Sequence, residues 1–90
     1  MFKTLEELIA IIRKRKESAD EESYTYKLLN NKKLNIEKVK EETVELVEAI
    51  EKNSNKIHEA ADVFYHLIMY LEANDVKIEE VMKELDKRKK

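Results

Sequence analysis

One segment, residues 57–71, constrains the fold of this chain more than any other. Wound as a helix, it places apolar side chains on almost every side. The broadest apolar face consists of Ile57, Ala60, Ala61, Phe64, Leu67, Ile68 and Leu71. A helix on the surface of a globular protein has a wide polar face instead. Segment 57–71 is therefore expected to lie inside a helical assembly, with neighbours on several sides.

The rest of the chain also favours helix. Its 90 residues include no Gly and no Pro, and 42% of them are charged. We expect a first helix with a capping box of Thr4 and Glu7 that fades over residues 13–18, and a short second helix capped by Ser23. A break at residues 30–33 precedes a third helix capped by Asn35.

Two further helices complete the expected pattern. The third helix ends near Lys52, a turn occupies residues 53–55, the fourth helix ends near Asn74, and a fifth closes the chain. The apolar spacing predicts that these side chains of the third and fifth helices face inward: Ile36, Val39, Thr43, Leu46, Val47, Ile50, Ile78, Val81, Met82 and Leu85.

The predicted fold is all-α: a single domain over residues 1–90 built as an antiparallel bundle of four to five helices. A domain this small buries only part of its apolar surface by itself. We expect a homodimer that completes the bundle, with the second subunit covering Val63, Met69 and Tyr70.

The composition argues against several functional classes. Without Gly there is no Gly-rich phosphate loop, and without Cys there is no disulfide or thiolate chemistry, which suits a reducing cytoplasm. A formal charge of −2 gives no overall field that attracts nucleic acid. No apolar run is long enough to span a bilayer, and the N-terminus does not resemble a signal peptide, so no membrane association is expected.

Acidic residues form two clusters on consecutive predicted helices. Glu59 and Asp62 are flanked by apolar residues, and one helix earlier come Glu41, Glu42 and Glu45. Carboxylates in apolar surroundings are costly to desolvate unless something neutralises them. Since a short connection makes the two helices antiparallel, the carboxylate pairs can face each other across a groove. Oxygen-only clusters suit Mg²⁺, with Mn²⁺ as the alternative.

Simpler interpretations of these residues remain open. The Glu-rich stretch 41–48 alone is typical of a solvated helix face. His66, one turn after Asp62, is expected to hydrogen-bond or pack beside a ligand rather than bind the ion. The basic run 87–90 is typical of a helix C-terminus that complements the macrodipole, with a nucleic-acid patch as the less favoured interpretation.

Four motifs occur in order along the chain: Ser23-Tyr24-Thr25, Lys38-Val39-Lys40-Glu41-Glu42-Thr43-Val44-Glu45, Glu59-Ala60-Ala61-Asp62 and Tyr65-His66-Leu67. Together they resemble phosphoribosyl-ATP pyrophosphohydrolase, a family of the all-α nucleoside triphosphate pyrophosphohydrolases whose shared pattern is ExxE followed by ExxD. The chain departs from the family pattern at Lys40 and Thr43, where Gly and Ala are usual, and in the loop before the third helix, which lacks a Gly. No departure removes an expected metal ligand.

The resemblance implies hydrolysis of the α–β phosphoanhydride of phosphoribosyl-ATP, the second step of histidine biosynthesis. Carried onto this chain, it makes four carboxylates the Mg²⁺ ligands: Glu42, Glu45, Glu59 and Asp62. Glu41, or a carboxylate that binds no metal, is the candidate base for the attacking water. Lys38 is expected to contact phosphate or balance the acidic cluster. Lys32, Lys33, Ser23 and Thr25 are the candidates for binding the phosphoribosyl end, with capping as the alternative role of the two hydroxyl residues.

Two other functions remain as alternatives. One is a housekeeping pyrophosphohydrolase of the same superfamily that acts on free or damaged nucleoside triphosphates. The other is a non-catalytic helical assembly module whose acidic face keeps it in solution. The first is distinguished by a panel of substrates, and the second by a titration with a divalent ion.

Overall fold

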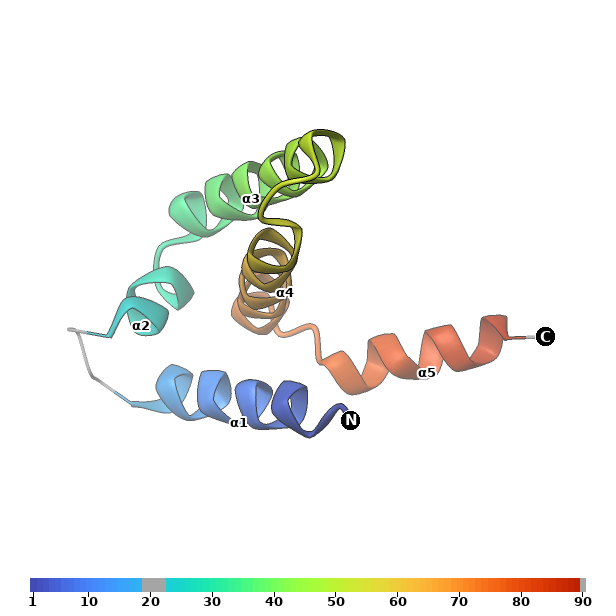
Figure 1. Ribbon diagram of the computed structural model, residues 1–90. Helices are drawn as coiled ribbons and strands as arrows, with labels where there is room; N and C mark the ends of the chain where they lie inside the picture. Colours follow the sequence, from blue (N-terminus) through green and yellow to red (C-terminus); the bar gives the residue numbers. More distant parts are fainter. Residues whose placement is uncertain (19–22, 90) are drawn as a thin grey trace.

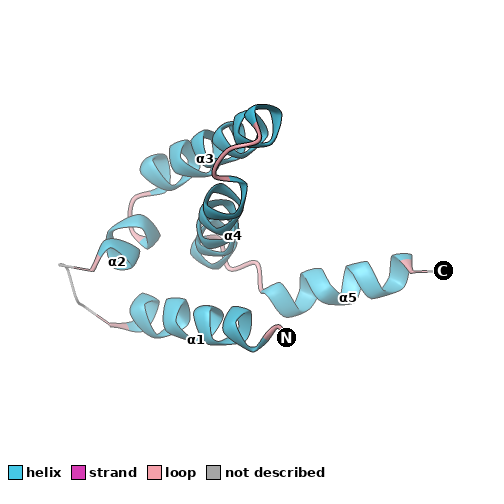
Figure 2. Ribbon diagram, viewed as in Figure 1, coloured by secondary structure: helices cyan, strands magenta, loops and turns pink. Residues whose placement is uncertain are grey.

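Helices account for nearly all of the structure. The computed structural model describes residues 1–18 and 23–89, which form five helices and no strand (Figures 1 and 2). The helices are α1 (Lys3–Glu17), α2 (Tyr24–Leu29), α3 (Lys32–Lys52), α4 (Lys56–Ala73) and α5 (Ile78–Arg88). The predicted all-α fold is confirmed. Within the described ranges, no helix is long and apolar enough to cross a membrane.

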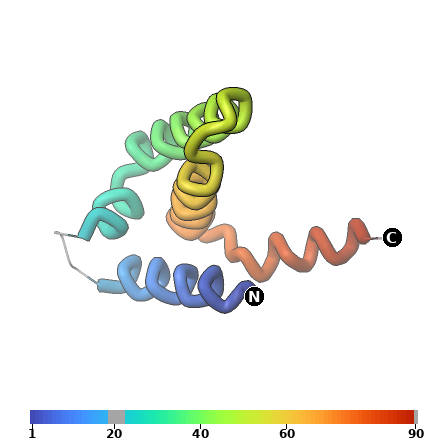
Figure 3. The backbone as a smooth tube through the Cα atoms, in the orientation of Figure 1, coloured from blue at the N-terminus to red at the C-terminus, as the bar shows by residue number. Residues whose placement is uncertain are grey.

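Helix α4 is the centre of the arrangement. It contacts α1, α2, α3 and α5, and its most extensive contact is with α3 (Figure 3). A turn of three residues joins α3 to α4, so the two helices form an antiparallel hairpin. Helix α5 extends away from the other four helices (Figure 1). The expectation that segment 57–71 has neighbours on several sides is therefore confirmed, but Ile57, Phe64 and Leu67 of its broadest apolar face are exposed.

The buried core lies where α1, α2 and α4 meet. It consists of Ile9, Ile12, Leu28, Leu29, Ile68 and Met69. Ile12, Leu28 and Met69 have no exposed surface at all. The short helix α2 thus contributes two of the core side chains, which explains why so few residues suffice to hold it in place.

The helix caps confirm one prediction and correct two. Ser23 caps α2 as predicted, because its hydroxyl accepts a hydrogen bond from the Tyr26 amide at 3.3 Å. Asn31, not Asn35, caps α3, with its side-chain oxygen accepting from the Leu34 amide at 3.1 Å. Helix α1 begins at Lys3 without a side-chain cap, so the capping box at Thr4 is wrong. In both corrected cases the helix begins before the predicted cap residue.

Two left-handed residues end α3 and α4 in a chain that has no Gly. Asn53 and Asp75 have φ values of 54° and 59°. The amide of Ser54 donates to the Ala49 carbonyl at 3.0 Å, and the amide of Val76 donates to the Leu71 carbonyl at 2.9 Å. These are the hydrogen bonds of the Schellman motif, in which Asn and Asp tolerate the left-handed position better than other non-Gly residues.

The prediction that the apolar stripes of α3 and α5 face inward is confirmed only in part: Ile78 packs against the core, whereas several of the other predicted residues are exposed. Val47 and Ile50 of α3 are 52% and 58% exposed, and Met82 and Leu85 of α5 are 49% and 51% exposed. Ile36 and Thr43 are exposed as well, whereas Val39, Leu46, Ile78 and Val81 are half-buried. The reason is that α3 turns a different side toward α4, the side that carries Asn35, Glu42 and Ala49.

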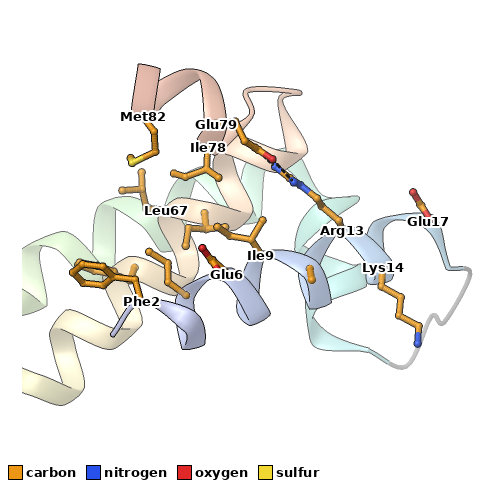
Figure 4. Close-up of a pocket in the computed structure, with 14 residues that line it drawn as sticks. Phe2, Glu6, Ile9, Arg13, Lys14, Glu17, Leu67, Ile78, Glu79 and Met82 are labelled. Atoms are coloured by element: carbon orange, nitrogen blue, oxygen red, sulfur yellow. Dashed lines mark hydrogen bonds and ion pairs between the residues drawn. The ribbon is translucent and has the colours of Figure 1, made fainter. Parts of the chain in front are cut away.

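An arginine joins three helices at the edge of the core. Arg13 of α1 donates from Nε and Nη2 to Glu72 of α4, both at 3.1 Å. It also donates to Glu79 of α5 at 2.8 and 2.6 Å (Figure 4). The Arg13 guanidinium holds the pKa of the Glu79 carboxyl down, at about 2. Sequence spacing does not reveal this contact, because 59 and 66 residues separate Arg13 from its partners.

Candidate metal centre

The α3–α4 hairpin brings carboxylates from both helices together. One oxygen each from Glu42, Glu45 and Glu59 lie within 4.8 Å of one another. Glu42 and Glu45 are one turn apart on α3, and Glu59 lies in the first turn of α4. Three oxygens this close fit a single hard cation, which accepts carboxylate ligands from several directions.

A second group lies beside the first and shares one residue with it. Nε2 of His58 and oxygens of Glu59 and Asp62 also lie within 4.8 Å of one another. His58 Nε2 is 3.3 Å from the Asp62 carboxylate, one turn along α4. Asp62 therefore lies next to the first group, because Glu59 belongs to both groups. In total the hairpin gathers four carboxylates and one imidazole.

The carboxylates repel one another and have lost much of their water. Burial raises the pKa of Glu42 to about 7, and the nearby charges of Glu45 and Asp62 add to this effect. The pKa of Glu59 is raised as well, again by burial first and by Glu45 and Asp62 after it. Closely spaced like charges favour protonation of one member or binding of a cation. The cluster is therefore electrostatically unfavourable in the absence of a metal ion.

Several buried polar atoms at this site find no hydrogen-bond partner within residues 1–18 and 23–89. They are Oε2 of Glu42, Oε2 of Glu59, Nδ1 of His66 and both side-chain polar atoms of Asn35. Buried polar atoms are nearly always satisfied by protein, water or an ion. The two carboxylate oxygens belong to the same three-residue cluster, so one cation can satisfy both.

His66 lies directly behind the cluster. Its side chain is 7% exposed, and its Nε2 is 4.0 Å from Oε1 of Glu42. The rings of Tyr24 and Tyr65 pack edge-on against the imidazole, with centroids at 6.3 and 5.1 Å. Burial lowers the pKa of His66 and favours the neutral ring. His66 thus lies beside Glu42, a candidate metal ligand, and its predicted role stays a prediction.

Two of the other predicted site residues lie near the cluster. Glu41 is exposed, and its carboxylate is 3.4 Å from Nζ of Lys38, which is half-buried. The hydrogen bond with Glu41 raises the pKa of Lys38 and keeps the ammonium charged. Lys38 therefore places a positive charge one turn from Glu42 on the same helix.

The remaining predicted residues have other surroundings. Ser23 serves as the cap of α2, and the Thr25 hydroxyl shares a hydrogen bond of 2.6 Å with the Tyr65 hydroxyl. Ser23 thus has the capping role that was the alternative, whereas Thr25 has a side-chain partner on α4 and does not cap a helix. Lys32 and Lys33 are exposed in the first turn of α3. Ten residues separate Lys32 from Glu42, which is about 15 Å along a helix.

His58 is the member of the site that sequence reasoning missed. Its side chain is 72% exposed, so it lacks the apolar surroundings that made Glu59 and Asp62 recognisable as site residues. The signal that would have found it is its spacing to Asp62. Residues four apart on a helix project from the same face, a spacing that places two metal ligands side by side.

The raised pKa of Glu42 predicts how the metal-free protein responds to pH. Because this pKa is about 7 instead of 4.5, Glu42 destabilises the fold above pH 7, and the penalty disappears as the pH falls to 4.5. We expect Glu42→Gln to melt at least about 4 °C above wild type near pH 8. This difference should shrink near pH 5, with melting followed by circular dichroism in the presence of EDTA.

Two other groups with shifted pKa values, His66 and Glu79, do not affect this comparison. The lowered pKa of His66 destabilises the fold on acidification, equally in both proteins to first order. Glu79 loses its stabilising contribution only below pH 4.5, toward about 2. A difference in melting temperature that stays constant from pH 8 to pH 5 would show that Glu42 is not the titrating group.

The chain is similar to several proteins that bear one name. It is 42% identical over 83 residues to phosphoribosyl-ATP pyrophosphatase of Methanosarcina acetivorans, an alignment that covers 87% of this chain and 80% of that protein. It is 36% identical over 95 residues to phosphoribosyl-ATP pyrophosphatase of Methanocella arvoryzae, with both proteins covered in full.

One relative is considerably longer. The chain is 45% identical over 87 residues to the histidine biosynthesis bifunctional protein HisIE of Pyrococcus furiosus, but spans only 41% of that protein's length. The model of one family, phosphoribosyl-ATP pyrophosphohydrolase, matches residues 5–89, nearly the whole chain. The family expected from the four sequence motifs is thereby confirmed: this chain belongs to the phosphoribosyl-ATP pyrophosphohydrolase family.

Proposed function

We propose that this chain hydrolyses the α–β phosphoanhydride of phosphoribosyl-ATP, giving phosphoribosyl-AMP and pyrophosphate in the second step of histidine biosynthesis. The observation that carries the proposal is the group of carboxylates between α3 and α4, in a member of this family. The names of the relatives support the same reaction. A cytoplasmic location goes with this proposal and agrees with a chain without Cys.

The residues present fit the Mg²⁺ ion that the family implies. One oxygen each from Glu42, Glu45 and Glu59 lie within 4.8 Å of one another, and Glu42 and Glu59 each have a buried oxygen without a partner among the described residues. Burial, and after it the charge of the neighbouring carboxylates, raises the pKa of both residues. We propose Glu42, Glu45, Glu59 and Asp62 as the ligands, with Mn²⁺ as an alternative to Mg²⁺. When bound, the ion neutralises negative charge on the triphosphate, which four carboxylates would otherwise repel.

The chain's own residues supply the proton acceptor and a positive charge. In the reaction, a water oxygen forms a bond to the α-phosphorus while the bond from that phosphorus to the α–β bridging oxygen breaks. The water must lose a proton, and the exposed carboxylate of Glu41 is the proposed acceptor. Lys38, whose Nζ is 3.4 Å from the Glu41 carboxylate, offers a cation to a phosphate oxygen.

His66 is proposed to position Glu42. With Tyr24 and Tyr65 packed against its ring, the imidazole has little freedom to move. From there Nε2 faces Oε1 of Glu42 and limits how that carboxylate turns. Partners of this kind orient metal ligands in many sites and tune their basicity.

Selectivity for phosphoribosyl-ATP over ATP requires groups outside the acidic cluster, because both substrates carry the same triphosphate. Lys32 and Lys33 are the remaining candidates after Ser23 and Thr25 are found in structural roles. Both lysines are exposed toward the N-terminal end of α3. There they can contact the 5′-phosphate of the phosphoribosyl unit.

This assignment predicts a selective loss of activity. The double variant Lys32→Gln, Lys33→Gln should lower kcat/KM for phosphoribosyl-ATP by about 10- to 100-fold. This loss corresponds to the free energy of one charge-assisted hydrogen bond to phosphate. Activity on ATP should change little, as measured by pyrophosphate release from each substrate. The control is Lys83→Gln, Lys87→Gln on α5, which removes the same charge. Equal losses of activity on both substrates would show that Lys32 and Lys33 contact the shared triphosphate or stabilise the fold.

A homodimer is proposed from the apolar surface that one chain leaves open. The groove between α1, α4 and α5 is lined by hydrophobic residues, including Phe2, Phe64, Leu67 and Met82 (Figure 4). Phe2 is 70% exposed and Phe64 is 57% exposed. The expected dimer surface needs one correction: Met69 belongs to the core of the single chain and cannot contact a partner. Contiguous apolar surface of this kind favours association.

A comparison of substrates tests the proposed function against its alternatives. Phosphoribosyl-ATP, ATP and oxidised or deoxy nucleoside triphosphates are each incubated with the protein and Mg²⁺. The proposal predicts clear preference for phosphoribosyl-ATP. Equal or better hydrolysis of the other triphosphates would favour the housekeeping enzyme. Absence of both hydrolysis and Mg²⁺ binding would favour the assembly module.

A further inference from the structure

We propose that His58, Glu59 and Asp62 form a site for a divalent transition-metal ion, with Nε2 of His58 as a nitrogen ligand. The site adjoins the Glu42–Glu45–Glu59 cluster and shares Glu59 with it. It rests on the proposed metal binding of the carboxylates but not on the identity of the substrate. It gives this chain a ligand that the oxygen-only site lacks.

The geometry of α4 supports a chelating site. His58 and Asp62 are four residues apart on the helix, and Nε2 of His58 is 3.3 Å from Oδ2 of Asp62. Glu59 completes the group, with one ligand atom from each residue within 4.8 Å of the others. Two ligands spaced four apart on a helix can bind one metal ion without any change of the backbone.

A surface ion pair between His58 and Asp62 would explain only part of this arrangement. Such pairs contribute little when both groups are accessible to water, and the His58 side chain is 72% exposed. The pair also leaves the Glu59 carboxylate incompletely satisfied. Its Oε2 is buried and has no hydrogen-bond partner among the described residues.

Glu42 gives a second, independent indication of a ligand. Only 9% of this residue is exposed, yet its Oε2 also lacks a partner in the described part of the chain. Its carboxylate points into the same space as that of Glu59. One protonated imidazole cannot neutralise four carboxylates. The combined cluster therefore has the charge and the open coordinating atoms to bind more than one cation.

The chemistry of the ligands predicts which ion prefers this site. Mg²⁺ binds oxygen and keeps several of its waters, so an imidazole offers it little. Zn²⁺, Co²⁺ and Ni²⁺ bind imidazole nitrogen strongly, and Mn²⁺ accepts it with carboxylates. His58 should thus increase affinity for the nitrogen-binding ions and leave Mg²⁺ affinity almost unchanged.

The experiment uses Zn²⁺ as the probe and the whole chain without substrate. The chain contains only two histidines, so each imidazole can be followed by nitrogen NMR on protein labelled with ¹⁵N-histidine. On addition of Zn²⁺ at neutral pH, the Nε2 resonance of His58 should move to the range of a metal-bound nitrogen. The resonances of buried His66 should change far less.

Calorimetry on variants gives the second readout. His58→Gln should weaken Zn²⁺ binding by about tenfold or more and change Mg²⁺ binding less than about twofold. Lys56→Gln, an exposed change two residues earlier on α4, should leave both affinities as in wild type. Circular dichroism checks that each variant is folded.

Two outcomes overturn the inference in distinguishable ways. If Mg²⁺ binds but His58→Gln leaves Zn²⁺ affinity unchanged and Nε2 of His58 does not shift, His58 is not a ligand and the carboxylate site stands. If wild-type protein binds neither ion, the inference fails together with the proposed metal centre. In either case hydrolysis of phosphoribosyl-ATP is measured separately.

Discussion

Replacing Glu45 by Gln, or Asp62 by Asn, is expected to lower kcat/KM for phosphoribosyl-ATP by at least about 100-fold, because losing even a group that orients a ligand costs 10–100-fold. The two residues come from different helices, and each lies in a group of possible metal ligands that includes Glu59. Each change keeps the size of the side chain and removes its charge. Initial rates of pyrophosphate release over a range of Mg²⁺ concentrations measure the loss.

A matched control separates this effect from a general change of charge. Glu48→Gln lies on the same helix as Glu45 but is exposed and outside the cluster. Its activity should stay within about twofold of wild type, as is usual for surface changes. Folding of all three variants is checked by circular dichroism. Wild-type rates in a folded Glu45→Gln or Asp62→Asn variant would remove that residue from the proposed ligand set.

Introducing a charge at Met69 is expected to unfold the chain, whereas the same change at Met82 is not. Met69 has no exposed surface and packs among the core residues of α1, α2 and α4. Burying an unpaired ammonium costs several kcal/mol, a large part of the about 5–15 kcal/mol that stabilises a typical domain. Met69→Lys should therefore lose most of its helical circular dichroism signal at room temperature.

Met82→Lys is the matched comparison, with the same residue type and the same new charge. Met82 is 49% exposed and lies on the groove of α1, α4 and α5. This variant should remain helical, but sedimentation should show weaker self-association than wild type. A folded Met69→Lys protein would contradict the core described above. A Met82→Lys protein that associates as strongly as wild type would exclude this groove as the dimer surface.

The sequence predicted the helices better than it predicted their faces. Composition and turn residues place five helices correctly, because helix formation depends largely on local preferences and on the absence of Gly and Pro. Orientation depends on partners far along the chain. On α3, the apolar positions Val47 and Ile50 suggested the inner face, but Glu42 and Ala49 face α4 instead.

That difference has a physical cause in the site itself. The Glu42 side of α3 must meet the Glu59 side of α4 for the carboxylates to come together, so the apolar stripe is turned outward. A single chain then leaves apolar surface uncovered, and this surface is available for a partner. Periodicity alone assigns apolar residues to the core and cannot distinguish the interior of one chain from an interface between two.

The carboxylates of the candidate site could be predicted from the sequence. Its histidine, His58, could not, and the surroundings of the other site residues were harder to predict. Glu42, Glu45 and Glu59 follow from their spacing and the hairpin geometry. His58 was not recognised because an exposed histidine gives no burial signal. Thr25 was a candidate for contacting the substrate or for capping a helix, but its hydroxyl bonds to Tyr65, a partner 40 residues away that no local pattern reveals.

Release of pyrophosphate from phosphoribosyl-ATP tests directly whether this chain catalyses the proposed hydrolysis. The purified chain is incubated with phosphoribosyl-ATP and Mg²⁺, with parallel samples in EDTA and with the Asp62→Asn variant. We expect one pyrophosphate and one phosphoribosyl-AMP for each substrate consumed, no turnover in EDTA, and turnover at least about 100-fold lower with Asp62→Asn. Release of orthophosphate instead of pyrophosphate, or equal turnover in EDTA, would contradict this expectation.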